Sequence, residues 1–317
     1  MTEAGMRVLV TGSSGYLGRT LVRRLRQDGH AVIGLDARPA PTTTLVGSVA
    51  ERALARTAIR DHGIDAIVHS AALHKPDMIA QQRADFLAVN TTGTLNLLEE
   101  AVAANVDRFV FTSTTSLMIS RTIRAGRAGG ATRAAWIDED LAPLEPRNIY
   151  GVTKLAAEHL CRLFHDLYGI ATIVLRTARF FPEADDMAHA IAQSDANTKA
   201  NEFLFRRLSV ADAAESHVAA LAKAPEIGFD TFIVSAMPPF VPDDCEELIA
   251  DAPAVVARYF PHYRDLYARR GWTMFDSIDR VYDPRGAARR LGFTCRTDFA
   301  AVLRQLETSP QVAADAW

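Results

Sequence analysis

A tyrosine and a lysine four residues apart are the side chains of this sequence best suited to acid–base chemistry. Tyr150 and Lys154 stand at the start of a segment with a helical pattern, and residues i and i+4 share one face of a helix. A nearby cation favours the ionised form of an acid. The Lys154 ammonium could therefore lower the pKa of the Tyr150 phenol from its ordinary value of about 10. The alternative is a surface tyrosine and lysine on an amphipathic helix. The strands and helices predicted around the pair distinguish an acid–base site from this alternative.

A glycine-rich turn near the N-terminus supplies the first such element. Arg7–Thr11 is a short apolar run that predicts a buried strand, and Leu21, Val22 and Leu25 follow with helical spacing. Between them lies the turn Gly12-x-x-Gly15-x-x-Gly18. Strand, glycine-rich turn and helix together are typical of a dinucleotide site, where the helix N-terminus binds the pyrophosphate.

A carboxylate at the end of the second predicted strand, Ala31–Asp36, indicates which dinucleotide binds. Asp36 follows the first glycine at about the distance of 20 residues expected for a group that holds the adenosine ribose. Because a carboxylate repels a 2′-phosphate, the sequence favours NAD. Arg38, two residues later, leaves NADP open as an alternative.

The pattern of strand and helix continues through the first half of the chain. We expect further strands at 45–48, 65–72, 108–116 and 170–175, which with the helices between them predict an α/β fold with a doubly wound, Rossmann-like parallel sheet. Beyond Arg176 prolines divide the chain into short pieces, which indicates a smaller, discontinuous C-terminal substrate domain. We therefore predict an NAD-binding domain at 1–176, to which 210–234 returns, and a mainly substrate-binding domain at 177–209 and 235–317.

Composition excludes several classes of protein. The net charge is −3 and 49% of the residues are hydrophobic, which favours neither nucleic-acid nor membrane-surface binding. The three cysteines form no Cys-x-x-Cys pair, so we expect reduced thiols and no metal site. The N-terminal residues lead into a strand without the pattern of a signal peptide, and no apolar run is long enough to span a membrane. We expect a cytoplasmic protein.

These motifs resemble those of the extended short-chain dehydrogenase/reductases, specifically the NAD-dependent epimerase/dehydratase family that includes UDP-galactose 4-epimerase. The landmarks, in the order that the family shows, are the glycine-rich turn, Asp36, His69-Ser70-Ala71-Ala72, Val89-Asn90-x-x-Gly93-Thr94 and Tyr150-x-x-x-Lys154, with Arg176, Val210-x-Asp212 and Leu291-Gly292-Phe293 extending the likeness.

The resemblance implies a role for each matching residue. Tyr150 is the expected acid/base, Lys154 is expected to bind the nicotinamide ribose, and Thr114 is expected to hydrogen-bond the reacting oxygen, with Ser113 as the alternative. The expected cofactor-binding residues are Gly12, Gly15, Tyr16, Leu17, Gly18, Asp36, Ser48, Val49, Ser70, Ala71, Ala72, His74, Asn90, Tyr150 and Lys154. Ser48 stands where the family usually has an acid.

The departures from the family pattern concern the substrate. Thr115-Ser116 replaces the acidic pair of the 4,6-dehydratases, which makes that branch a poor match. Arg179 stands where an asparagine commonly meets the nucleotide, and the usual nucleotide-binding arginine is displaced to Arg206 or Arg207. We expect Thr114, Thr115, Arg179 and Arg207 to contact substrate. An insertion at 117–137 carries four arginines that either hold an anionic substrate group or belong to a solvated loop.

The expected function is epimerisation of a nucleotide sugar through a transient ketone, with NAD as cofactor and no metal. A net dehydrogenase or ketoreductase acting on a sugar or another polar alcohol is the alternative. A non-catalytic NAD sensor would not need the set of Thr114, Tyr150 and Lys154. Members of the family that the chain resembles commonly form homodimers, which implies a homodimer formed by two long helices, near 85–104 and 148–168.

Overall fold

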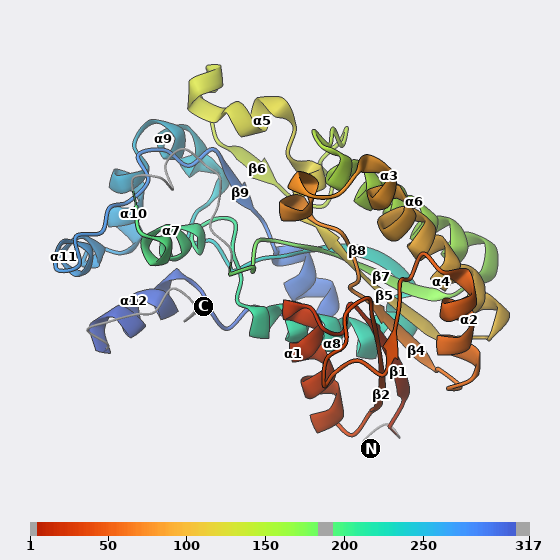
Figure 1. Ribbon diagram of the computed structural model, residues 1–317. Coiled ribbons are helices and arrows are strands. Elements are labelled where there is room, and N and C mark those ends of the chain that lie inside the picture. Colours follow the sequence, from red (N-terminus) through yellow and green to blue (C-terminus); the bar gives the residue numbers. More distant parts are fainter. Residues whose placement is uncertain (1–4, 183–192, 309–317) are drawn as a thin grey trace. The chain divides into compact units, whose positions relative to one another are not determined.

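The computed structural model describes residues 5–182 and 193–308. Parts of three predictions fall outside these residues. They are the N-terminal residues 1–4, residues 183–192 of the expected substrate segment 177–209, and the C-terminal end of 235–317. Figure 1 traces the chain and labels its elements.

A seven-stranded sheet has the order β3-β2-β1-β4-β5-β7-β8, and the pairs β1–β2, β1–β4, β2–β3 and β4–β5 are parallel. The strands are β1 (Arg7–Thr11), β2 (Ala31–Asp36), β3 (Leu45–Val46), β4 (Ala66–His69), β5 (Arg108–Thr114), β7 (Ala171–Thr177) and β8 (Phe229–Val234). The order reverses between β1 and β4, which is the place where dinucleotides bind in doubly wound folds. The predicted α/β, Rossmann-like sheet is confirmed.

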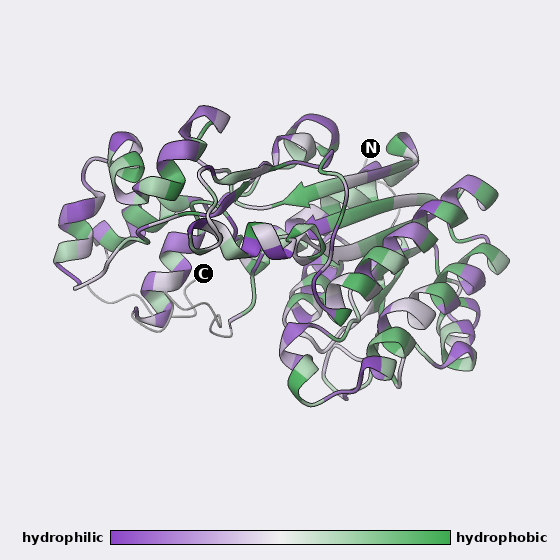
Figure 2. Cartoon of the chain, turned by 90° about the horizontal axis from the view of Figure 1, so that it is seen from above, coloured by the Kyte–Doolittle hydropathy of each residue, from purple (hydrophilic) through white to green (hydrophobic). Residues whose placement is uncertain are grey.

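Helices cover both faces of this sheet, with α1 and α8 on one side and α2, α4 and α6 on the other (Figure 1). Their bounds are α1 (Tyr16–Gln27), α2 (Arg52–Arg60), α3 (Arg83–Phe86), α4 (Gly93–Ala103), α6 (Ile149–Tyr168) and α8 (Val210–Ile227). Green and purple bands alternate along the helices in Figure 2, as expected for helices with one apolar face. The central strands are apolar throughout because both faces of the sheet are buried; Val8, Leu9 and Val10 of β1 are fully enclosed.

The chain divides into two compact units. The first contains residues 1–117, 146–176 and 213–232, and the second contains 118–145, 177–212 and 233–317. Residues 118–145, which we had expected within the NAD-binding domain, belong to the second unit.

The second unit has its own core of short helices and a two-stranded parallel sheet. Its elements are α5 (Arg121–Ala125), β6 (Ala135–Ile137), α7 (Asp195–Glu202), α9 (Cys245–Ala250), α10 (Ala252–Tyr259), α11 (Tyr263–Ala268), β9 (Arg280–Tyr282) and α12 (Phe299–Thr308). Strand β6 of the insertion pairs with β9, with Ala135 opposite Arg280. This pairing places the insertion in the second unit.

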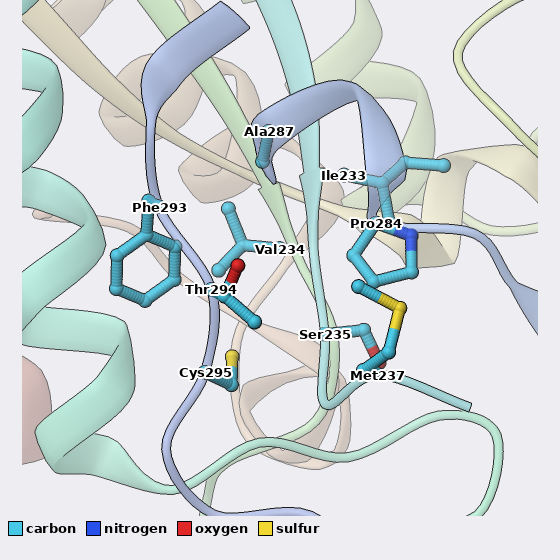
Figure 3. A pocket seen from close by; sticks show the side chains of 9 residues that line it. All are labelled: Ile233, Val234, Ser235, Met237, Pro284, Ala287, Phe293, Thr294 and Cys295. Atoms are coloured by element: carbon cyan, nitrogen blue, oxygen red, sulfur yellow. The ribbon is translucent and has the colours of Figure 1, made fainter. Parts of the chain in front are cut away.

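A small hollow in the second unit is lined by none of the predicted site residues. It lies between the end of β8, where Ile233 and Val234 stand, and the segment that ends at Cys295 (Figure 3). Its empty volume is about 190 Å³ with open solvent included. Apolar side chains such as Phe293 and Pro284 line much of it.

Across the described ranges, 5–182 and 193–308, no helix has the length and apolar character that a membrane crossing requires. Within these same residues no three side chains of His, Cys, Asp or Glu are grouped to hold a metal ion. The three cysteines are buried and free.

Candidate functional site

The glycine-rich turn joins β1 to α1 at a point that only glycine fits. Gly12 has φ +71°, a conformation that residues with a Cβ rarely adopt. A Cβ on Gly18 would collide with the Gly12 carbonyl oxygen. Gly15 is the N-cap of α1 and has no side chain to cap it, so the first N–H groups of the helix are available to a ligand.

Two further features of this turn fit a dinucleotide. The buried Ser14 hydroxyl has no hydrogen-bond partner in the described part of the chain, and a buried polar atom without a partner is costly unless a ligand satisfies it. The Ser14 N–H donates to the Asp36 carboxylate at 2.9 Å, so the turn and the end of β2 are tied together.

Asp36 is nearly enclosed and is held at both oxygens. Oδ2 accepts from the Ser14 N–H, and Oδ1 accepts from the Arg38 N–H at 2.9 Å. Each carboxylate oxygen can accept a second hydrogen bond, so Asp36 can also bind ribose hydroxyls. The predicted neighbours in the adenine region lie after β3, where Val49 is buried and the Ser48 hydroxyl accepts from the Ala50 N–H at 3.2 Å.

A hydrogen-bond chain through His69 fixes the loop after β4. The Thr94 hydroxyl donates to the Asn90 carbonyl at 2.7 Å, so it accepts from His69 Nε2 at 3.0 Å. His69 Nδ1 then accepts from the Thr11 hydroxyl at 2.7 Å, and Thr11 in turn accepts from the Ala71 N–H at 3.2 Å. Burial, and next the charge of Lys154, hold the pKa of His69 well below its usual range. A neutral imidazole is the form that this chain requires.

Asn90 links the same loop to helix α6. It lies in a π-helical segment, Leu87–Thr92, and π-helical turns are frequent at functional sites. Its side chain accepts from the Leu73 N–H at 2.8 Å and donates to the Leu73 carbonyl at 2.9 Å. It also donates to the Thr153 hydroxyl at 3.0 Å, beside Lys154. Ser70, Ala71, Ala72 and His74 thus lie in a loop that is tied to α6.

Helix α6 begins where the sequence predicts and presents Tyr150 in its first turn. The Asn148 side chain caps the helix by accepting from the Gly151 N–H at 2.9 Å, and Gly169 ends it with φ +73°. At Gly151 a Cβ would approach Pro146 to 2.9 Å, so a small residue is needed beside the tyrosine.

The two hydroxyls at the end of β5 have different partners. The Ser113 hydroxyl donates to Glu158 at 2.5 Å, whereas Thr114 is hydrogen-bonded to Tyr150. The Thr114 oxygen also accepts from the Ser116 N–H at 3.1 Å. Both partners lie on α6, so Thr114 meets the helix at Tyr150 and Ser113 meets it two turns later at Glu158. Thr115 is buried at the start of the following 3-10 turn.

The surroundings of Tyr150 raise its pKa instead of lowering it. Burial raises the pKa of Tyr150 to about 12, the Thr114 hydrogen bond lowers it in part, and Asp77 raises it. This result differs from our expectation that Lys154 depresses it. The ammonium of Lys154 lies 3.9 Å from the centre of the Phe111 ring, and burial lowers the pKa of Lys154 to about 7.

The predicted substrate arginines lie together in the second unit, around one buried carboxylate. Arg207 is fully buried, and it donates to Glu202 at 2.9 Å and to the Phe181 carbonyl at 3.0 Å. Arg206 donates to the other Glu202 oxygen at 2.6 Å, and Arg179 lies 3.7 Å from Glu202. Substrate binding by Arg179 and Arg207 stays a prediction.

Two arginines of the insertion make structural contacts instead of facing solvent alone. Arg127 donates to the Ala250 carbonyl at 3.3 Å, and Arg133 donates to the Pro242 carbonyl at 2.6 Å and to Glu246 at 3.4 Å. These bonds favour a structural role for this half of the insertion.

The sequence reasoning missed Glu158 and gave Arg176 no role beyond the family likeness. The two form a buried ion pair with an N–O distance of 2.8 Å. One sequence feature could have pointed to Glu158: it follows Lys154 by four residues, which places both side chains on the same face of the predicted helix.

Comparison with known proteins agrees with the fold and with the cofactor elements. The model of the NAD dependent epimerase/dehydratase family matches residues 8–228. UDP-glucose 4-epimerase of Azospirillum brasilense is 31% identical over 184 residues, which cover 55% of this chain and 49% of that protein. A 3-beta-hydroxysteroid dehydrogenase of Mycolicibacterium neoaurum is 37% identical over 196 residues, which cover 58% and 50%. The matches span about half the length of these relatives.

Solved structures resemble the chain over nearly its whole length. UDP-N-acetylglucosamine 4-epimerase from Bacillus cereus has a TM-score of 0.65 at 22% identity, covering 96% of this chain and 98% of that one. A short-chain dehydrogenase/reductase from Agrobacterium tumefaciens, solved with bound NAD, has a TM-score of 0.66 at 23% identity, covering 95% and 96%. At these identities the likeness shows the fold.

Proposed function

Because the chain belongs to the NAD-dependent epimerase/dehydratase family, a family of enzymes that use NAD, we propose that it epimerises a nucleotide sugar through a transient ketone. The observation that carries the proposal is the hydrogen-bonded pair of Thr114 and Tyr150 in the unit that also contains the glycine-rich turn and Asp36. An NAD-binding module without chemistry would not need a buried phenol at this place.

Each residue of the pair has a defined task in the proposed reaction. The Tyr150 oxygen takes the proton of the reacting hydroxyl, and later returns it to the ketone oxygen. The Thr114 hydroxyl donates to the same oxygen as charge develops on it. NAD, if held by the glycine-rich turn and Asp36, would supply the reversible hydride chemistry at that carbon.

The cofactor would lie on the residues that the structure ties together. Gly12, Gly15 and Gly18 leave room for the pyrophosphate, with Tyr16 and Leu17 offering the N–H groups at the helix N-terminus. Asp36 would hold the adenosine ribose, and the loop fixed by Asn90 would lie along the nicotinamide half.

Acid–base work near neutral pH requires Tyr150 to ionise more readily than its buried environment allows. A positive charge beside the phenol would lower its pKa. Lys154, on the same helix, and the positive nicotinamide ring are the two groups that we assign to this task. The function therefore requires that Lys154 itself remains protonated.

The proposed substrate class follows from the relatives and from the arginines of the second unit. UDP-glucose and UDP-N-acetylglucosamine are named for relatives and neighbours, and guanidinium groups such as those of Arg179 and Arg207 suit an anionic group. A homodimer is part of this proposal, since Val152, Leu163 and Leu167 are exposed apolar residues along α6.

A net NAD-dependent dehydrogenase is the second candidate. It is favoured by the steroid dehydrogenase relative, which shares 37% identity over the matched half. A dehydrogenase could use the same acid/base and cofactor residues, but would release NADH after each turnover.

The test is to supply purified protein with UDP-glucose or UDP-N-acetylglucosamine and no added cofactor. The proposal expects the C4 epimer of at least one of them to form through many turnovers, with NAD retained by the protein. Formation of an oxidised sugar only when NAD is supplied in excess would favour the dehydrogenase.

A further inference from the structure

A buried ion pair lies behind the proposed site. The Arg176 guanidinium donates to both oxygens of Glu158, with Nη2–Oε2 at 2.8 Å and Nε–Oε1 at 3.1 Å. The Ser113 hydroxyl donates to Oε1 at 2.5 Å. All three side chains are at least nine-tenths buried. Three donors from β5 and β7 thus fix one carboxylate on α6.

This carboxylate stands next to both parts of the site. Glu158 follows Lys154 by four residues on α6, so the two side chains share one face of the helix. Its hydrogen bond to Ser113 holds the strand residue that immediately precedes Thr114. A charge that is expensive to bury therefore lies one helical turn from Lys154 and is bonded to the strand residue next to Thr114.

The other neighbours of Lys154 cannot replace this charge. The Phe111 ring offers only its face. Burial raises the pKa of the Cys161 thiol and lowers that of His69, so both are neutral at physiological pH. Burial lowers the pKa of Lys154, and Cys161 and then Glu158 oppose that effect. Because burial keeps the Cys161 thiol neutral, Glu158 is the one of the two that carries a negative charge at physiological pH.

We propose that Glu158 is a positioning residue that keeps the Lys154 ammonium protonated, with Arg176 and Ser113 holding its carboxylate in place. The inference rests on the proposed function, because only a site that uses the charge of Lys154 needs it. Burial lowers the pKa of Lys154 to about 7 even with Glu158 in place, so without Glu158 the neutral amine would prevail at the pH where Tyr150 must ionise.

A titration of Lys154 tests the proposal without any substrate. The sequence contains four lysines, Lys75, Lys154, Lys199 and Lys223. Protein labelled with ¹³C at the lysine ε-carbon should therefore give few resonances, and Lys154→Met identifies the one of interest. In Glu158→Gln we expect the titration midpoint of Lys154 to fall by about one pH unit. Glu158→Asp, which keeps the charge, should restore most of the difference.

A matched control is Glu100→Gln. Glu100 is also a buried carboxylate held by arginines, but it lies on α4 and is paired with Arg52 and Arg56. This variant should leave the Lys154 midpoint unchanged. If Glu158→Gln alone does not fold, the double variant Glu158→Gln/Arg176→Met removes both charges together, and it should move the midpoint in the same direction by less.

An unchanged Lys154 midpoint in Glu158→Gln, or in the double variant if only that folds, would overturn the proposal and assign the pair to stability alone. Since the midpoint is read from the resting protein, this outcome is independent of whether the chain epimerises a sugar. A lowered midpoint in a protein that shows no epimerase activity would refute the proposed function and leave the role of Glu158 standing.

Discussion

Tyr150 carries the proposed chemistry, and its place in the structure makes ionisation difficult. The ring is buried, and the Thr114 hydrogen bond offsets only part of the effect of burial on its pKa. A buried acid of this kind is inert until a cation approaches it. This property suits an enzyme whose acid/base should act only when the cofactor and substrate are in place.

Replacing Tyr150 by phenylalanine tests this role. Tyr150→Phe removes only the hydroxyl, so it should retain NAD binding and lose turnover by about 100-fold or more. Tyr168→Phe, on the exposed end of the same helix, is the control and should behave like the unaltered protein. Turnover that survives in Tyr150→Phe would remove the phenol from the mechanism.

The preference for NAD over NADP depends on one residue, Asp36. Asp36→Asn keeps an oxygen that can accept from the Ser14 or Arg38 N–H but removes the negative charge. The affinity for NADP relative to NAD should rise by about tenfold or more, because the repulsion of the 2′-phosphate is lost. Binding of each cofactor is measured by calorimetry. Equal affinities in the unaltered protein would mean that Arg38 accommodates the 2′-phosphate.

At the scale of single elements, local sequence predicts where strands and helices lie in the chain but not which side chains of different elements contact one another. Strands β1 and β2 and the start of α6 agree with the sequence, because apolar runs, glycines and the Asn148 cap are local signals. The choice of Thr114 over Ser113 is different. Both hydroxyls bond to α6, Thr114 to Tyr150 and Ser113 to Glu158, and no local signal indicates which hydroxyl meets which side chain of the helix.

Lys154 on helix α6 predicts how the free energy of unfolding depends on pH. Because burial lowers the pKa of Lys154 to about 7, the folded protein binds fewer protons than the unfolded chain between pH 7 and the ordinary lysine pKa. The buried ammonium therefore destabilises the fold at pH 7 and below, and this penalty on the free energy of unfolding should be relieved as the pH rises toward the ordinary lysine pKa, by about 5 kcal/mol in total. Chemical denaturation at pH 7 and pH 9 should show a smaller gain in Lys154→Met. An identical gain in both proteins would show that Lys154 is not neutralised on folding.

At the scale of the whole molecule, the sequence predicts the parallel sheet better than the division of the chain. The strand order follows from repeated strand-helix units, whose contacts are close in sequence. The membership of residues 118–145 in the second unit follows from the pairing of β6 with β9, which are far apart in the chain. The sequence left open whether the insertion holds an anionic substrate group or is a solvated loop, and no local signal predicts that Ala135 stands opposite Arg280.

The fate of the transferred hydrogen is the measurement that tests the central claim most directly. UDP-glucose carrying deuterium on carbon 4 is incubated with the purified protein and no added cofactor, and the products are analysed by NMR and mass spectrometry. An epimerase must return the hydride that it took, so the C4 epimer should form with the deuterium still on carbon 4 and no label released. The same substrate design applies to UDP-N-acetylglucosamine. Deuterium recovered in free NADH together with an oxidised sugar would contradict the account.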